Sequence, residues 1–235
     1  MALPKLATAT YELQLPSTAE TVKYRPFLVK EQKVLMMASE SKDNKQITEA
    51  VRNIVTNCPF GKLDVDKLPL FDIEYIFIKL RAKSVGEKAM VSVLCPDDKK
   101  TRVPVEVNLD QIDMTMKEDH SNIINITDEV SINMGYPMLR DFTNTKTNVD
   151  DTSAAFSLIK MCISSVSEGN KTHERVDFTD KDLDEFIDSL NTEQLGKVMK
   201  FFDTMPKLRH VAKVVNPNTK HESEIVIEGL ASFLA

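Results

Sequence analysis

The start of the chain, two short strand-like runs around a turn and then a helix, constrains the fold most. Residues 11–15 and 21–24 have the composition of strands, and the segment between them begins with a proline. This arrangement predicts an antiparallel hairpin. Residues 25–27, Arg-Pro-Phe, lead directly into residues 29–39, whose apolar spacing predicts a helix. A hairpin that feeds a helix favours an α+β fold.

Two further helices are predicted before residue 87. Residues 46–57 carry an apolar stripe at helical spacing, and either Asp43 or Asn44 is the expected N-cap. Residues 68–86 form a strongly apolar segment that ends at a glycine. A buried strand over residues 75–80 is the alternative there, but the length of the segment and the basic residues near its end favour a helix.

The remaining elements follow from changes in hydrophobic period. Residues 90–94 and 102–109 alternate around a turn and predict a second hairpin, and residues 122–134 predict one or two strands. The last part predicts three helices and a third hairpin, at residues 153–166, 179–190 and 193–204 and at strands 210–215 and 224–228.

A polar, apolar-poor stretch at residues 143–153 is the best candidate for a domain boundary. It predicts an N-terminal α+β domain over residues 1–142 and a C-terminal helical region, ending in a hairpin, over residues 154–235. Residues 92–109 and 213–230 also share a layout in which an apolar pair, a proline and a lysine precede alternating apolar residues. Either the two halves are related by duplication, or a common turn pattern with proline and lysine has recurred by chance.

Composition excludes several classes of protein. The net charge is −6 and no basic stripe occurs, so nucleic acid is not an expected partner. No apolar run approaches the roughly 18–20 residues that span a bilayer, and the first residues do not form a secretory signal. The three cysteines, Cys58, Cys95 and Cys162, are odd in number and far apart, which fits a reducing cytosol.

Candidate metal sites all fall short of a complete ligand set. The turn Cys95-Pro96-Asp97-Asp98 resembles half of a zinc knuckle, but a structural zinc site needs four ligands. Residues 180–184 contain alternating aspartates, yet the glycine and glutamate of a calcium loop are missing, so a helix start is preferred. Asp66 is better explained as a cap before the helix at residue 70. We expect no metal.

Catalytic motifs are also absent from the sequence. The four histidines lie in polar surroundings without a metal-binding or nucleophile pattern, and the chain has no phosphate loop and no dinucleotide fingerprint. Active sites built from distant residues escape such a test. The expectation is a protein without cofactors that is not an enzyme.

Tyr24, Arg25 and Phe27 are the candidate partner-binding residues near the N-terminus. Two aromatic residues and an arginine around a rigid proline are the residue types enriched in interface hot spots. The alternative is structural: Tyr24 and Phe27 pack the hairpin onto the first helix, and Arg25 lies outside. We favour the structural role for Phe27 and leave Arg25 open.

The chain resembles the baseplate hub assembly family of T-even-like contractile-tailed phages. The resemblance is carried by YELQLPSTAETVKYRPFLVKEQKVLMMA (residues 11–38), NCPF (57–60), LDVDKLP (63–69), FDIEY (71–75), KLRAKSVG (79–86) and the ending EGL (228–230) with Phe233. Related chains often carry cysteine pairs in the hairpin turns, of which only Cys95 is present here.

The resemblance implies a phage protein that is made in the bacterial host cytoplasm and helps to build the central hub of the baseplate. Its expected partners are other hub proteins or the tape measure protein, and Leu230 and Phe233 join the candidate contact residues. A transient assembly chaperone that is absent from the virion is the alternative. A tail-associated hydrolase is a third hypothesis, from a different class.

Overall fold

The chain folds into two compact units that differ from the predicted domains. The computed structural model describes residues 6–41, 43–61, 63–143 and 151–229. One unit contains residues 1–115 and 207–235, and the other contains residues 116–206. This corrects the predicted division into residues 1–142 and 154–235: strand β11 (Lys207–Val215) pairs with β6 (Asp113–Thr115), so the last strands belong with the first part of the chain. Most of the predicted linker, residues 144–150, lies outside the described residues.

Unit 1, residues 1–115 and 207–235, combines short antiparallel sheets with helices. Its described elements, besides β6 and β11, are β1 (Tyr11–Gln14), β2 (Thr21–Tyr24), α1 (Val29–Ser41), α2 (Asn44–Asn57), β3 (Pro59–Phe60), the 3-10 turn η1 (Val65–Lys67), α3 (Leu70–Ser84), β4 (Lys88–Leu94), β5 (Arg102–Asn108), η2 (Leu109–Gln111) and β12 (Glu222–Glu228). The predicted hairpins and the helices of this unit are confirmed, and every described strand pair is antiparallel. The fold is therefore α+β, as predicted.

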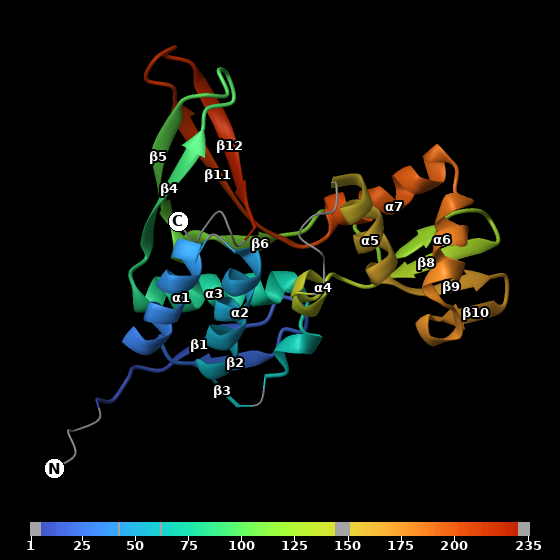
Figure 1. Ribbon diagram of the computed structural model, residues 1–235, viewed down its shortest axis with the longest axis horizontal. Helices are drawn as coiled ribbons and strands as arrows, with labels where there is room; N and C mark the ends of the chain where they lie inside the picture. The colour runs from blue at the N-terminus through green and yellow to red at the C-terminus, as the bar shows by residue number, and fades with distance from the viewer. Residues whose placement is uncertain (1–5, 42, 62, 144–150, 230–235) are drawn as a thin grey trace. The chain divides into compact units, whose positions relative to one another are not determined.

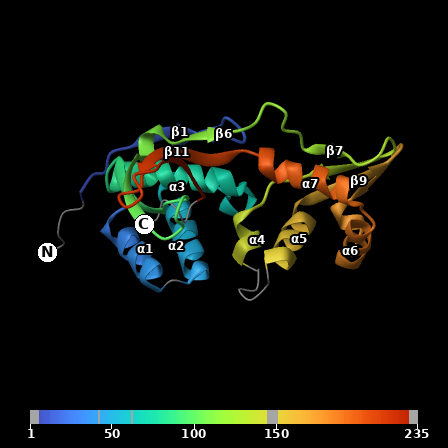
Figure 2. The same cartoon turned by 90° about the horizontal axis from the view of Figure 1, so that it is seen from above.

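Helix α3 forms the centre of unit 1. Its buried residues come from almost every turn, and Ile73, Ile76 and Phe77 have no exposed surface. It lies between the α1–α2 pair and the strands β1, β6 and β11 (Figure 2). Because it is covered on several sides, α3 is apolar nearly all round, which explains why its sequence also fitted a buried strand.

The hairpins β4–β5 and β11–β12 stand side by side and extend away from the helices (Figure 1). We call residues 88–108 and 207–228 the arm. Alternate residues of the four strands point inward and share one core with Ile78 and Ala82 of α3. The arm is thus rooted in the core of unit 1.

Unit 2, residues 116–206, is built around the sheet β10-β9-β8-β7. Its described elements are β7 (Ile123–Asn125), β8 (Val130–Met134), α4 (Leu139–Thr143), α5 (Asp151–Cys162), β9 (Ile163–Glu168), β10 (Lys171–Glu174), the 3-10 turn η3 (Arg175–Asp177), α6 (Asp180–Asp188) and α7 (Thr192–Thr204). Helices α5, α6 and α7 contribute Ile159, Leu183 and Phe201 to a core shared with the sheet.

One predicted helix of unit 2 is confirmed, but its C-terminal end was placed too late. The helix expected over residues 153–166 begins at Asp151 and ends at Cys162, and strand β9 follows without a break. Ile163 and Val166 are three residues apart, as on a helix face, but Val166 pairs with Ile132 of β8 and His173 of β10. Long-range pairing overrides the local spacing here.

Local cap signals were mostly interpreted correctly. Asp43 caps α2 by accepting a hydrogen bond from the Lys45 amide at 2.9 Å. Thr179 and Asp182 form the predicted capping box of α6. Asp66, by contrast, pairs with Arg52 of α2, and α3 begins after Pro69 without a side-chain cap. The predicted cap role of Asp66 is wrong.

Asp72, in the first turn of α3, fixes the first hairpin to the helix. Its carboxylate is fully buried and accepts hydrogen bonds from the Ser17 amide, at 3.1 Å, and from the Ser17 hydroxyl. We expect Asp72→Ala to lower the free energy of unfolding by about 1–3 kcal/mol, because two Ser17 donors lose their acceptor. Asp72→Asn keeps one acceptor and should cost less; denaturant unfolding would measure both.

The same site gives a pH dependence. Burial raises the pKa of the Asp72 carboxyl above its ordinary value, and the hydrogen bonds from Ser17 oppose this only in part. Between the unfolded and folded pKa values the unfolded chain binds fewer protons, so Asp72 lowers stability as the pH rises through that range. The stability of Asp72→Asn relative to the wild type should therefore increase from about pH 4 to pH 7. A difference that stays constant would contradict this.

Candidate interaction surfaces

The predicted contact residues near the N-terminus are internal. Tyr24 and Phe27 are 3% and 6% exposed, and the Phe27 amide donates to Ser84 Oγ at 2.9 Å. Burial of both rings favours the structural alternative, although the Phe27 amide bonds to α3 and not to the first helix. Leu230 and Phe233, the other two candidates, lie outside the described residues.

Arg25 is held by an ion pair inside unit 1. Its guanidinium donates to Glu31 Oε1 at 3.0 Å and to the Asn57 carbonyl at 3.3 Å, and the two charged side chains are only 15% and 4% exposed. The other oxygen of Glu31 accepts from the Leu28 amide at 2.8 Å. Arg25 therefore joins β2, α1 and α2, and its charge is already used within the fold.

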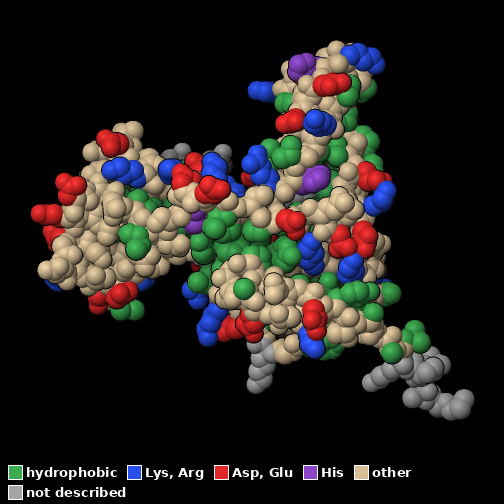
Figure 3. All heavy atoms as spheres, turned by 180° about the vertical axis from the view of Figure 1, so that it is seen from behind, with side chains coloured by type: hydrophobic (Ala, Val, Ile, Leu, Met, Phe, Trp, Pro, Cys, Tyr) green, Lys and Arg blue, Asp and Glu red, His purple; other side chains and the backbone are tan. Residues whose placement is uncertain are grey.

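The arm carries exposed apolar side chains on its outer faces. Alternation turns every second residue of each strand outward, and hydrophobic groups there lie between charged ones (Figure 3). The exposed members are Met90, Leu94, Val211, Val215 and Val226. Val211 is 49% exposed and lies directly opposite Val226, which is 41% exposed. The ion pairs Arg209–Glu228 and Lys213–Glu224 flank these valines on either side.

Helix α1 and the residue before it form a second exposed apolar surface in unit 1. Its members are Leu28, Val29, Val34, Met36 and Met37, and the exposed fraction of Met37 reaches 70%. Exposed methionines adapt to partners of differing shape. The sequence pattern placed Val34 and Met37 on one helix face with Ala38, but only Ala38 is buried, and Glu31 is the other buried residue of α1.

The tips of the two arm hairpins are joined by hydrogen bonds. Asn216 is 1% exposed and donates through Nδ2 to both carboxylate oxygens of Asp97 at 3.0 Å, and the Thr219 hydroxyl donates to the same carboxylate. Asn218 Nδ2 donates to Thr101 Oγ1 at 2.9 Å. These bonds hold the pKa of Asp97 below its usual value. We call this network the tip clamp.

The two turns joined by the tip clamp have the same backbone form. Lys99 and Lys220 occupy the left-handed region, with φ of 53° and 62°, and their amides donate to the carbonyls of Cys95 and Asn216. The shared layout of residues 92–109 and 213–230 is thus a real similarity of two hairpins. Both belong to unit 1, so they do not mark the ends of two consecutive halves. A duplication stays a hypothesis.

The half knuckle at Cys95 uses its polar groups within the protein. Asp98 accepts from the amides of Lys100 and Thr101, both at 3.0 Å. Among the described residues, no three histidine, cysteine, aspartate or glutamate side chains are grouped so that they could hold a metal ion.

The cysteine thiols are buried and free. Burial raises the pKa of Cys58 to about 11 and that of Cys162 to about 12. Both are therefore protonated at neutral pH, and a protonated thiol is a poor nucleophile.

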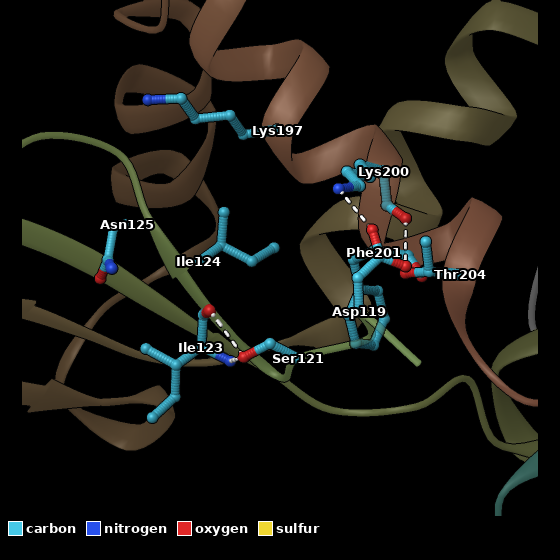
Figure 4. Close-up of a pocket in the computed structure, with 9 residues that line it drawn as sticks. All are labelled: Asp119, Ser121, Ile123, Ile124, Asn125, Lys197, Lys200, Phe201 and Thr204. Atoms are coloured by element: carbon cyan, nitrogen blue, oxygen red, sulfur yellow. Dashed lines mark hydrogen bonds and ion pairs between the residues drawn. The ribbon is translucent and has the colours of Figure 1, made fainter. Parts of the chain in front are cut away.

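Unit 2 has a hollow of about 210 Å³ between β7 and α7 (Figure 4). Ile124 and Phe201, both almost fully buried, form its apolar floor. Lys197 and Lys200 of α7 and Asp119 contribute charged groups around it, and Lys200 Nζ pairs with Asp119 at 2.7 Å. We call this the β7–α7 groove. Sequence analysis missed it, because the two sides are about 75 residues apart along the chain.

His120 lies behind this groove in an aromatic cluster. Its Nδ1 is 3.0 Å from Thr204 Oγ1 and its Nε2 is 3.0 Å from the Tyr136 hydroxyl. The ring also contacts Phe201, with centroids 5.1 Å apart. The sequence around His120 is polar, but in the fold this histidine joins the segment before β7 to the end of α7.

Comparison of this sequence with known protein families identifies the class to which the chain belongs. Residues 8–235 match the model of the T4 bacteriophage base plate protein family, so the chain belongs to that family. No curated protein and no solved structure matches it. The predicted resemblance to a phage baseplate family is confirmed; a specific place in the hub stays a prediction. Within the described residues, none of the helices has the length and apolar character needed to cross a membrane.

We expect Asn216→Ala to destabilise the arm by about 1–2 kcal/mol, because it removes buried hydrogen bonds and leaves Asp97 without two of them. Its Oδ1 also accepts from the Asn218 amide at 2.9 Å, so the second turn should loosen. The control is Asn133→Ala, a change at an exposed residue of β8, which should alter stability by less than about 0.5 kcal/mol. Hydrogen exchange at the two turns would measure the effect, and unchanged protection would contradict it.

His120 predicts a second pH dependence. Burial lowers the pKa of His120, and Asp119 opposes this only in part. The unfolded chain, in which a histidine has a pKa of about 6.5, then binds more protons than the folded chain. The contribution of His120 to stability is therefore present above that pH and is lost as the pH falls. His120→Phe keeps a ring but does not titrate. The melting temperature of the wild type should fall relative to this variant between pH 7.5 and 5; parallel curves would contradict the prediction.

Proposed function

We propose that this base plate protein acts in the central hub of the phage tail, by binding other hub proteins or the tape measure protein. It would be made in the host cytoplasm and would catalyse no reaction of its own. The observation that carries the proposal is the arm: a rigid, clamped pair of hairpins with exposed apolar side chains between ion pairs. Apolar patches rimmed by polar groups are typical of protein interaction sites.

Three features support a binding role over a catalytic one. Arg25, a candidate contact residue in the sequence, pairs with Glu31, and Cys58 and Cys162 are buried thiols whose pKa is raised. Exposed apolar side chains gather instead on α1 and the arm. Since assembly needs ordered surfaces that lose little entropy on docking, a preformed arm suits it.

A transient assembly chaperone is the second candidate, favoured by the exposed methionines of α1, because chaperones bind varied apolar segments. Counting the protein in purified virions separates the two. Stoichiometric copies would support a hub component, and absence from virions would support the chaperone.

The test of partner binding uses a phage that encodes Val211→Lys with Val226→Glu. These changes remove the apolar pair but continue the existing ladder of Lys/Arg on β11 against Glu on β12, so the hairpin should fold. We expect recovery of baseplate proteins with the tagged variant to fall at least about tenfold, since an apolar interface centre would become charged.

The matched control is Val176→Lys, which changes a 91% exposed valine of unit 2 in the same way. It should leave the recovery unchanged. If the arm variant recovers the same baseplate proteins as the wild type, the arm is not the binding surface. Hydrolysis of peptidoglycan by the purified wild-type protein would instead revive the hydrolase hypothesis.

A further inference from the structure

The β7–α7 groove has the features of a binding site for an extended peptide segment. Strand β7 is at the end of the sheet β10-β9-β8-β7. The Asn122 carbonyl accepts from the Met134 amide and the Ile126 amide donates to the Val130 carbonyl, both of β8. The alternate residues Ile123 and Asn125 therefore direct their backbone groups away from β8. These backbone groups lie on the side of β7 on which a further strand could pair.

The Ser121 hydroxyl bonds both backbone groups of Ile123 that point away from β8. Ser121 Oγ accepts from the Ile123 amide at 3.1 Å and donates to the Ile123 carbonyl at 3.0 Å (Figure 4). These are the two groups that an added strand would bond. Ser121 thus bonds both backbone groups of Ile123, and a small rotation of its side chain would release them.

The charges of the groove define the chemistry of its occupant. Lys200 is neutralised by Asp119 at 2.7 Å, but the contacts of Lys197 are long: 3.4 Å to the Ile126 carbonyl and 3.8 Å to Glu193. The Lys197 side chain is 43% exposed and lines the groove on the α7 side (Figure 4). In a chain of net charge −6, this leaves a locally positive rim above Ile124 and Phe201.

We propose that the β7–α7 groove binds an extended, acidic segment of another baseplate protein. The segment runs along β7, places an apolar side chain over Ile124 and Phe201, and sets a carboxylate against Lys197. Backbone pairing supplies affinity, and the apolar and acidic side chains supply specificity. This inference rests on the proposed function and names the kind of partner that unit 2 recognises.

The test uses two labelled probe peptides and the full-length protein. One peptide alternates leucine with aspartate, and the other alternates leucine with lysine. We expect the aspartate peptide to bind at least about tenfold more tightly in fluorescence polarisation, and Lys197→Glu to weaken it at least about tenfold. The matched control is Lys181→Glu on α6, an 85% exposed lysine of the same unit, which should leave the affinity unchanged.

Amide chemical shifts distinguish binding along β7 from non-specific electrostatic attraction. Shifts on binding should centre on residues 121–125, where Ser121 releases Ile123. Equal binding of the two peptides, or equal losses in Lys197→Glu and Lys181→Glu, would overturn the proposal, as would the absence of binding at millimolar peptide. If the wild-type protein still recovers baseplate proteins from infected cells, that failure concerns the groove alone and leaves the proposed function intact.

Discussion

The pairing of β11 with β6 is the interaction on which the architecture depends. It joins residues 207–209 to residues 113–115 and so closes unit 1 across more than ninety intervening positions. Because β11 is anchored there, its hairpin reaches the β4–β5 hairpin and the two share one core. The same pairing makes residues 116–206 an insertion, with both ends leaving from neighbouring strands. Without this pairing the β11–β12 hairpin would not be held beside β4–β5, and Asn216 would not reach Asp97.

This pairing also explains what the sequence could and could not predict. Elements fixed by local signals were found: the first hairpin, the Asp43 cap of α2 and the capping box at Thr179. The domain division was missed, because a polar stretch is visible in a sequence whereas a three-residue strand such as β6 has no strong local signal. Strand β9 was missed for a related reason, since Ile163 and Val166 fit a helix until β8 is placed beside them.

The candidate contact residues show a second limit of sequence reasoning. Tyr24 and Phe27 belong to residue types that are common in interface centres and equally common in cores, so residue type alone does not separate the two roles. Burial separates them here, and Arg25 is resolved by its ion pair with Glu31. The surfaces that the structure offers instead, on the arm and in the β7–α7 groove, are made from residues distant in sequence, and no local pattern announces them.

The tip clamp suits the arm to the proposed role in assembly, because it joins the tips of the two hairpins. Long hairpins are marginally stable alone, and a flexible arm would lose conformational entropy on docking. Cross-turn bonds from Asn216, Asn218 and Thr219 fix the two tips before any partner arrives. One aspartate, Asp97, and four neutral side chains, those of Thr101, Asn216, Asn218 and Thr219, form these bonds. The arm is therefore already ordered in the folded protein. Docking through Val211 and Val226 would then lose little conformational entropy.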